Sequence, residues 1–470
     1  MSQLKELRKS ILLGVYISLM MIFILPVWLT HSFVTINGPF DFYLSEIYFD
    51  LANANSPANE YYQRIPIEFA GSFQLAVMYI KAGFNSNTLF DKILFSLWIS
   101  AFLLLARSIT LSLNPKADYR PFLFFSIVFC APLINGDWNF LGSVIFFLLG
   151  MKILTGINTY KHPAPVFLLL FLTNFFLLWC SFFWFIMFSA LQIIIILLNP
   201  SLLVRKKFLW AATAPLPAIL FPSLFFNITG FNFEFANISD QLQKLLNMEL
   251  LKTFPETVWW ITFPLSALFG ILWVYSLLNT FIFLKPNLNH RFWHRVSMGF
   301  SIISLVIFLI LHNKFDSDFN DTFVFLAIIF LLFSLSCLRI KKIYMILAGL
   351  FCLLVTIEHL RMQYLAWDQL SLKAGEYESF EMKFDTSKNL KLDVFNESKN
   401  ESNLPYLISR NNKNLFIHDT FRNETEFSAH FLKRKQLPDT SNLVLRNIRD
   451  GIFPETITCF KENNTCIYSK

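Results

Sequence analysis

The sequence predicts a polytopic α-helical membrane protein with a small α+β domain outside the membrane. Of its 470 residues, 55% are hydrophobic, and the mean hydropathy is +0.51. The apolar residues fall in blocks of about 18–25 residues, the length that crosses a bilayer as a helix. Beyond residue 360 these blocks stop and charged residues become denser. A soluble fold of this size has no interior large enough for that much apolar surface.

Eleven apolar blocks are expected to cross the membrane, all within a transmembrane domain of residues 1–360. They cover residues 11–33, 90–113, 120–136, 138–156, 163–179, 181–198, 208–226, 257–284, 296–312, 321–338 and 343–360. Lys5, Arg8 and Lys9 precede the first block without a cleavage site, so this block is interpreted as a signal anchor. Basic residues also collect in alternate short loops, which are expected to be cytoplasmic. The prediction is an integral membrane protein with a cytoplasmic N-terminus and an extracytoplasmic C-terminal domain.

One further apolar block, residues 65–84, contains Glu68, Gln74 and Lys81. If the basic loops are cytoplasmic and successive loops alternate between the two sides, both flanks of this block lie on the outer side. The block is therefore predicted to lie along the membrane surface as an amphipathic segment, within an outer loop of residues 34–89. The alternative is that this block crosses the membrane as a twelfth span, which would place the charges of one loop on the side that the positive-inside rule disfavours.

Residues 361–470 are expected to form the α+β domain. Short alternating stretches at residues 414–418 and 442–445 are typical of half-buried strands. Near the C-terminus, Cys459 and Cys466 flank a stretch that has the composition of a hairpin turn. An extracytoplasmic location permits a disulfide between them, and a pair of free thiols is the alternative.

The outer loop concentrates carboxylates and aromatic rings next to lipid. If the stretch that begins at Asp41 is helical, Ser45 and Tyr48 share its face. A carboxylate at the lipid boundary loses hydration and becomes a stronger base, so Asp41 is the candidate catalytic residue. A guanidinium at Arg64 can bind a phosphate with two parallel hydrogen bonds.

Six other residues are candidate substrate-binding residues. They are Tyr43, Glu46, Tyr61 and Tyr62 in the outer loop, and Asp137 and Asn139 at an outer turn between two spans. The alternative is that the tyrosines only solvate the membrane interface. For Asp137 and Asn139, the alternative is that they only form a polar turn that joins two helices.

Cofactor motifs are absent from the sequence. It contains no P-loop, no Rossmann glycine fingerprint and no zinc-ligand spacing, so no cofactor is identified. The acidic outer loop at residues 316–321 could supply carboxylate ligands, so a divalent metal stays an open alternative. The basic residues follow the pattern of membrane topology, so no nucleic-acid partner is expected.

The outer loop resembles that of the GT-C superfamily of integral-membrane glycosyltransferases. In that superfamily a first span leads into an outer loop with an early Asp, two juxtamembrane helices and a basic residue before a proline. Asp41 matches the early Asp, Arg64-Ile65-Pro66 matches the basic element, and residues 65–84 match the second juxtamembrane helix. The resemblance implies that Asp41 deprotonates the acceptor and that Arg64 meets the phosphate of the donor.

The same resemblance implies transfer of a sugar from a polyprenyl-phosphate-linked donor to a lipid-linked or surface glycan on the outer face. The expected partners are membrane lipid, the polyprenyl-phosphate-linked sugar and the glycan acceptor. The first loop and residues 135–141 also resemble a group of uncharacterised bacterial polytopic proteins, which implies a bacterial inner membrane. Aligned on Ile47-Tyr48, that group has its Asp at the position of Pro39, two residues before Asp41.

Two other functions stay open. A transporter or flippase for a lipid-linked glycan requires charged residues that line a path through the spans, and the spans are poor in such residues. A non-catalytic membrane scaffold would use its outer domain to bind a partner. An Asp41 that faces no cavity would favour the scaffold.

Overall fold

The structure is a computed structural model, and it describes most of the chain before residue 380 and separate strands beyond it. The described residues are 2–31, 33, 35–55, 59, 62–64, 71–82, 87–115, 119–160, 162–199, 202, 204–220, 233–251, 259–281, 288–313, 318–338, 340–379, 390–395, 415–419, 432–434, 443–446, 456–460 and 465–469. The chain divides into two compact units. The first comprises Met1–Pro26, Glu68–Gln74 and Leu94–Tyr364, and the second comprises Val27–Ile67, Leu75–Ile93 and Leu365–Lys470.

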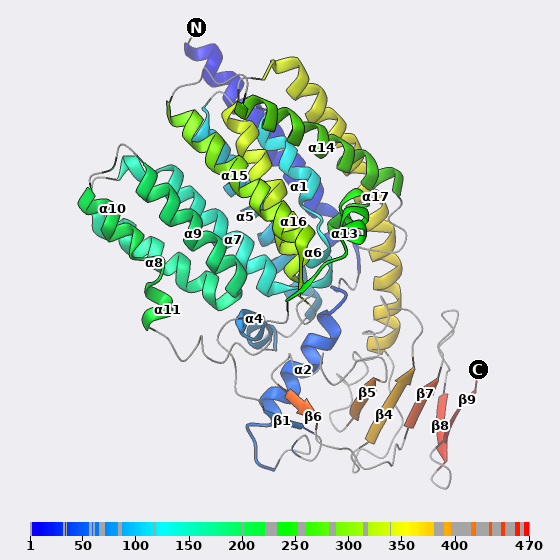
Figure 1. Cartoon of the computed structure of the whole chain (residues 1–470). Coiled ribbons are helices and arrows are strands. Elements are labelled where there is room, and N and C mark those ends of the chain that lie inside the picture. The colour runs from blue at the N-terminus through cyan, green and yellow to red at the C-terminus, as the bar shows by residue number, and fades with distance from the viewer. Residues whose placement is uncertain are drawn as a thin grey trace. The chain divides into compact units, whose positions relative to one another are not determined.

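Eight of the described helices are long and apolar enough to cross a membrane. They are α1 (Ser2–Leu29), α5 (Asn87–Leu113), α7 (Trp138–Thr155), α8 (Pro163–Cys180), α14 (Trp259–Phe281), α15 (Leu288–Ile310), α16 (Asp318–Cys337) and α17 (Lys342–Ser379). A shorter apolar helix, α9 (Phe182–Leu198), follows α8 directly. Figure 1 shows α7, α8 and α9 side by side, and α15 next to α16. These helices form the polytopic bundle that the composition predicts.

One expected span, residues 120–136, is not a single helix. It forms the 3-10 helix η1 (Arg120–Ile127) and the short helix α6 (Ala131–Asn135), each with a proline in its first turn. Proline starts a helix more easily than it continues one, because it lacks the N–H that an interior turn needs. Almost all of η1 is buried.

Another expected span, residues 208–226, is also interrupted. Its described part contains the end of α10 (Val204–Ala211) and the short helix α11 (Leu216–Leu220), and residues 221–232 lie outside the described residues. Pro215 falls at the break between the two helices, and Pro217 lies in the first turn of α11. The count of eleven spans therefore stays a prediction.

The helix α16 is the most enclosed of the candidate spans, with 89% of its apolar window buried. Two of its polar side chains, Thr322 and Ser334, are hydrogen-bonded to neighbouring helices. Trp184 donates a hydrogen bond from its indole nitrogen to Thr322 Oγ1 at 3.1 Å, and the hydroxyls of Ser276 and Ser334 are 2.6 Å apart. Small hydroxyl side chains of this kind let apolar helices approach closely.

The block at residues 65–84 contains the helix α4 (Phe73–Ala82), whereas residues 65–70 lie outside the described residues. A helix of 10 residues is about 15 Å long, which is about half of the hydrocarbon core. The helix α4 is therefore too short to cross a membrane by itself. This length is consistent with the expected surface segment.

Smaller elements connect the helices of the first unit. They are η2 (Ile157–Thr159), β2 (Phe233–Phe235), α13 (Ile238–Leu246), η3 (Glu249–Leu251) and β3 (Leu311–Asn313). The strands β2 and β3 pair antiparallel. In α13, the apolar side chains of Ile238, Leu242 and Leu246 are exposed at a spacing of four residues. Such a stripe is typical of a helix that lies flat in the membrane interface.

The second unit contains the outer loop, except for Glu68–Gln74, and the C-terminal strands. The outer loop contributes α2 (Gly38–Asp50) and β1 (Tyr62–Arg64), and β1 pairs antiparallel with β6 (Leu432–Arg434). The strands β4 (Leu390–Phe395), β5 (Leu415–Asp419) and β7 (Leu443–Arg446) form a parallel sheet in the order β5-β4-β7. The alternating stretches predicted as strands fall on β5 and β7. The assignment of the whole C-terminal region as an α+β domain stays a prediction.

The last two strands, β8 (Thr456–Phe460) and β9 (Thr465–Ser469), pair antiparallel with Cys459 directly opposite Cys466. The expected hairpin is therefore present. Directly opposite residues in such a ladder bring their Cβ atoms within about 5.5 Å of each other. This register is compatible with the predicted disulfide, which stays a prediction.

Candidate functional site

Asp41 lies in the first turn of α2 and is almost completely buried, with 4% of its surface exposed. The helix begins at Gly38, and Pro39 in the first turn favours the start because its backbone angle is already helical. The backbone N–H of Asp41 donates to the carbonyl of Asn37 at 2.9 Å.

The face that Asp41 was expected to share with Ser45 is buried. Ser45 is 1% exposed, whereas Tyr48, one turn further on, is half-buried. The predicted helix is present, although it begins three residues before Asp41. The start of α2 is therefore enclosed, and its end approaches the surface.

A buried ion pair lies next to the start of α2. Lys81 Nζ is 2.8 Å from Asp91 Oδ1 and 2.7 Å from Asp91 Oδ2. The two side chains are 5% and 1% exposed. Lys81 lies in the last turn of α4, and Asp91 lies four residues after the start of α5. The pair therefore joins the end of one helix to the beginning of the next.

Gly38 connects α2 to this ion pair. A Cβ atom at Gly38 would lie 3.3 Å from Asp91 Oδ2 and 3.4 Å from Lys81 Nζ. It would also lie 2.7 Å from Thr35 Oγ1, which is too close for any side chain. Only glycine lets the backbone approach the pair this closely. Asp41 follows three residues later, so its backbone lies about one helical turn from Gly38.

Thr35 adds a polar atom to the same region. Its side chain is 2% exposed, and among the described residues its hydroxyl has no hydrogen-bond partner. A buried hydroxyl without a partner is unfavourable unless a ligand or water satisfies it. Thr35 and the Lys81–Asp91 pair thus form a buried polar cluster around Gly38 at the start of α2, which we call the α2 cluster.

Arg64 lies at the other end of α2 and is exposed. Its Nε and Nη2 atoms donate to the carbonyl of Tyr48 at 3.1 and 2.6 Å. The guanidinium also lies over the Tyr48 ring, 4.4 Å from its centroid. Arg64 therefore caps the C-terminal end of α2, where carbonyls lack partners within the helix. These two hydrogen bonds use two of the five N–H groups of the guanidinium.

The other outer-loop candidates have different environments. Tyr43 is 3% exposed and packs inside the second unit, whereas Glu46 is half-buried. Tyr62 lies in β1, opposite Arg434. Tyr61 lies outside the described residues.

Asp137 and Asn139 belong to a separate set of hydrogen bonds in the first unit. Asp137 caps α7 by accepting the N–H of Phe140 at 3.2 Å. Asn139 Oδ1 accepts the N–H of Gln74 at 2.8 Å. The Gln74 side chain accepts the N–H of Trp138 at 2.7 Å and donates to the Gly136 carbonyl at 3.3 Å. These contacts stabilise the turn between α6 and α7, which agrees with the simpler alternative of a polar turn.

The sequence analysis did not single out Asp91 or Thr35. Asp91 falls in an apolar block and Lys81 in an amphipathic one, so each was explained by its own segment. One feature of the sequence could have indicated the pair. Asp91 is a carboxylate near the start of an expected span, and Lys81 is a single lysine ten residues before it. Such a pair is a reasonable candidate for a buried ion pair, because isolated charges are too costly in an apolar environment.

A metal site is not evident in the part of the chain that the structure describes, since no three His, Cys, Asp or Glu side chains converge there. No known family model matches the chain, and no curated protein matches its sequence.

Proposed function

We propose that the protein is a membrane glycosyltransferase of the GT-C kind. It transfers a sugar from a polyprenyl-phosphate-linked donor to a lipid-linked or surface glycan on the outer face of a bacterial inner membrane. The observation that carries this proposal is the burial of Asp41 in the first turn of α2, the helix that begins at the α2 cluster. A poorly hydrated carboxylate accepts a proton more readily than one in water.

In the proposed reaction, Asp41 takes the proton of the acceptor hydroxyl. The hydroxyl oxygen then forms a bond to the anomeric carbon of the sugar, and the bond from that carbon to the phosphate oxygen breaks. The polyprenyl phosphate leaves with the electron pair, and its negative charge is stabilised by the remaining N–H groups of Arg64.

The spacing of the two groups supports this assignment of roles. Tyr48, which holds Arg64, follows Asp41 by seven residues, so the two are about 10 Å apart along the helix. In the proposed transfer the attacking hydroxyl and the departing phosphate lie on opposite sides of one anomeric carbon, so a base and a cation at the two ends of one helix can each serve one of these groups.

The antiparallel pairing of β1 with β6 supports the proposed topology. Residues 62–64 and 432–434 are hydrogen-bonded to each other, so they must lie on the same side of the membrane. An even number of crossings therefore separates the outer loop from the C-terminal strands. Eleven spans satisfy this parity, with one before the outer loop and ten after it.

The test of this proposal is the substitution Asp41→Asn, which keeps the size of the side chain and removes the base. We expect transfer to fall by about 10²–10⁴-fold. Asp50→Asn is the matched control, because Asp50 is an exposed carboxylate at the other end of the same helix. The measurement is mass spectrometry of surface glycans from cells that express each variant at equal levels. Normal glycan in the Asp41→Asn strain would exclude this mechanism.

A transporter for a lipid-linked glycan is the second candidate. Buried ionisable side chains within candidate spans favour it, since Asp91, His294 and His359 are each at most 1% exposed. The two functions differ in what happens to the donor. A transporter moves the intact lipid-linked sugar between leaflets of a proteoliposome, whereas the proposed enzyme releases polyprenyl phosphate.

A further inference from the structure

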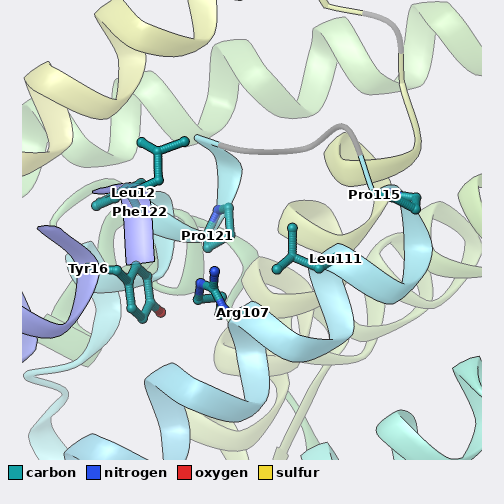
Figure 2. Close-up of a pocket in the computed structure, with 7 residues that line it drawn as sticks. All are labelled: Leu12, Tyr16, Arg107, Leu111, Pro115, Pro121 and Phe122. Atoms are coloured by element: carbon teal, nitrogen blue, oxygen red, sulfur yellow. The ribbon is translucent and has the colours of Figure 1, made fainter. Parts of the chain in front are cut away.

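A pocket of about 160 Å³ lies in the first unit, at the opposite end of α1 from the outer loop. It is lined by Leu12 and Tyr16 of α1, Arg107 and Leu111 of α5, and Pro121 and Phe122 of η1 (Figure 2). Of the lining residues that the structure describes, Arg107 alone carries a charge. The pocket is therefore an apolar recess with one cation in its wall.

The Arg107 guanidinium lies 5.7 Å from the centroid of the Tyr16 ring. Tyr16 is held in place because its hydroxyl donates to the carbonyl of Leu103 at 2.7 Å. Within the described ranges, Arg107 has no hydrogen-bond acceptor and no carboxylate partner. Its N–H donors thus lie against the ring and have no acceptor among the residues that the structure describes.

Two other cations, Arg120 of η1 and Lys152 of α7, have protein acceptors. Arg120 donates to the backbone carbonyls of Ser336 and Leu338. Lys152 donates to the hydroxyl of Ser112 at 2.7 Å. These bonds give Arg120 and Lys152 structural roles, and Arg107 differs from both because its donors have no acceptor among the described residues.

The surroundings of the pocket suit a lipid. On α1, Ile11 and Val15 flank Leu12 and are 57% and 47% exposed, as expected for side chains that contact acyl chains. The sequence places Lys5, Arg8 and Lys9 in the preceding turns of the same helix. This end of the bundle is the one that the charge pattern predicts to be cytoplasmic, where anionic lipids attract basic residues.

We propose that this pocket binds the phosphate of an anionic membrane phospholipid, with the Arg107 guanidinium as the donor. The volume of about 160 Å³ is below the range of about 300–1,000 Å³ that is usual for a complete small ligand. It is sufficient for a headgroup phosphate whose acyl chains lie outside, along the exposed apolar side chains of α1. This lipid site is separate from the α2 cluster and does not depend on the proposed enzymatic function.

The test is native mass spectrometry of the full-length protein in detergent. The protein is titrated with phosphatidylglycerol, with phosphatidylcholine of the same acyl chains, and with inorganic phosphate. We expect phosphatidylglycerol to bind more tightly than phosphatidylcholine, and Arg107→Gln to weaken the binding of phosphatidylglycerol by about tenfold or more, because a charge-assisted hydrogen bond is lost.

Lys206→Gln is the matched control. Lys206 is also a cation over an aromatic ring, 5.8 Å from the centroid of Trp210, but it does not line the pocket. This variant should bind phosphatidylglycerol as the wild type does. Leu111→Trp is a second test, because it fills the recess and keeps the charge, and it should also weaken binding.

Three results would overturn the proposal. The first is equal binding of phosphatidylglycerol by the wild type and by both pocket variants. The second is an equal loss of affinity in Lys206→Gln, which would indicate general attraction between basic residues and anionic lipid. The third is displacement of phosphatidylglycerol by inorganic phosphate that binds as tightly as the lipid. This result would show that the pocket is a site for free anions.

Discussion

At the scale of single residues, the α2 cluster depends on two charged side chains, Lys81 and Asp91, that are buried in the protein interior. Asp91 is 1% exposed and Lys81 is 4% exposed, so each requires the other. The ion pair contributes little net stability over an apolar pair, because desolvation of both groups offsets their attraction. Its value is positional, since Gly38 and the first turn of α2 pack directly against it.

The ion pair predicts an asymmetric result from mutation. Asp91→Ala leaves a buried unpaired lysine and should lower the free energy of unfolding by about 3–5 kcal/mol. The double substitution of Lys81→Met with Asp91→Leu removes both charges and should recover most of this loss. Thermal unfolding of the purified protein in detergent measures both effects. Additive losses in the double variant would show that the two residues do not act as a pair.

The sequence favoured a helix at Asp41 from its local pattern, and α2 contains that residue, whereas the catalytic role of Asp41 stays a prediction. It did not predict the ion pair, since that contact joins two segments whose individual patterns are explained without it. Lys81 was expected at the water boundary, and the structure buries it against Asp91. Asp137 was a candidate for binding substrate, and the structure shows it capping α7. An acidic residue just before an apolar run is a common signal for a helix cap.

At the scale of elements, α2 is stabilised at both ends. Pro39 favours its start, and Arg64 supplies hydrogen bonds to the carbonyl of Tyr48 near its end. The capping role of Arg64 was not visible in the sequence, because 16 residues separate the two partners. The element therefore places the proposed base and the proposed phosphate-binding cation on one rigid support.

The two roles of Arg64 can be separated by substitution. Arg64→Ala should lower stability by about 1 kcal/mol, because an exposed charged hydrogen bond contributes modestly. If the residue also binds the donor, the KM for the donor should rise by about tenfold or more. Arg64→Lys should keep the charge and lose the paired hydrogen bonds.

The control for Arg64 is Arg361→Ala, since Arg361 is also exposed and is bound to Glu358 at 2.6 Å. This substitution should leave the KM for the donor unchanged. A normal KM in Arg64→Ala, together with reduced stability, would limit Arg64 to helix capping.

At the scale of the whole molecule, the sequence predicted a polytopic bundle and a change of character after residue 360. The structure confirms the apolar helices, and α17 continues past that boundary to Ser379. It also groups the outer loop with the C-terminal residues in one unit. That grouping depends on the pairing of β1 with β6, which joins residues almost 370 positions apart. Hydropathy and charge patterns carry no information about such distant pairing.

The β1–β6 register predicts a specific cross-link. Gln63 lies directly opposite Lys433, so Gln63→Cys with Lys433→Cys should form a disulfide under mild oxidation. Gln63→Cys with Lys391→Cys is the control, because Lys391 pairs with Phe416 in the other sheet. Gel mobility before and after reduction measures the cross-link. A cross-link in the control alone, or in neither pair, would contradict the shared location of the outer loop and the C-terminal strands.

The central claim is that Asp41 is the base of a sugar transfer from a polyprenyl-phosphate donor. Its most direct test is the release of polyprenyl phosphate from labelled donor by purified protein in proteoliposomes, supplied with the glycan acceptor. We expect release by the wild type and by Asp50→Asn, and about 10²–10⁴-fold slower release by Asp41→Asn. Equal rates for Asp41→Asn and the wild type, or translocation of intact donor without release, would contradict the claim.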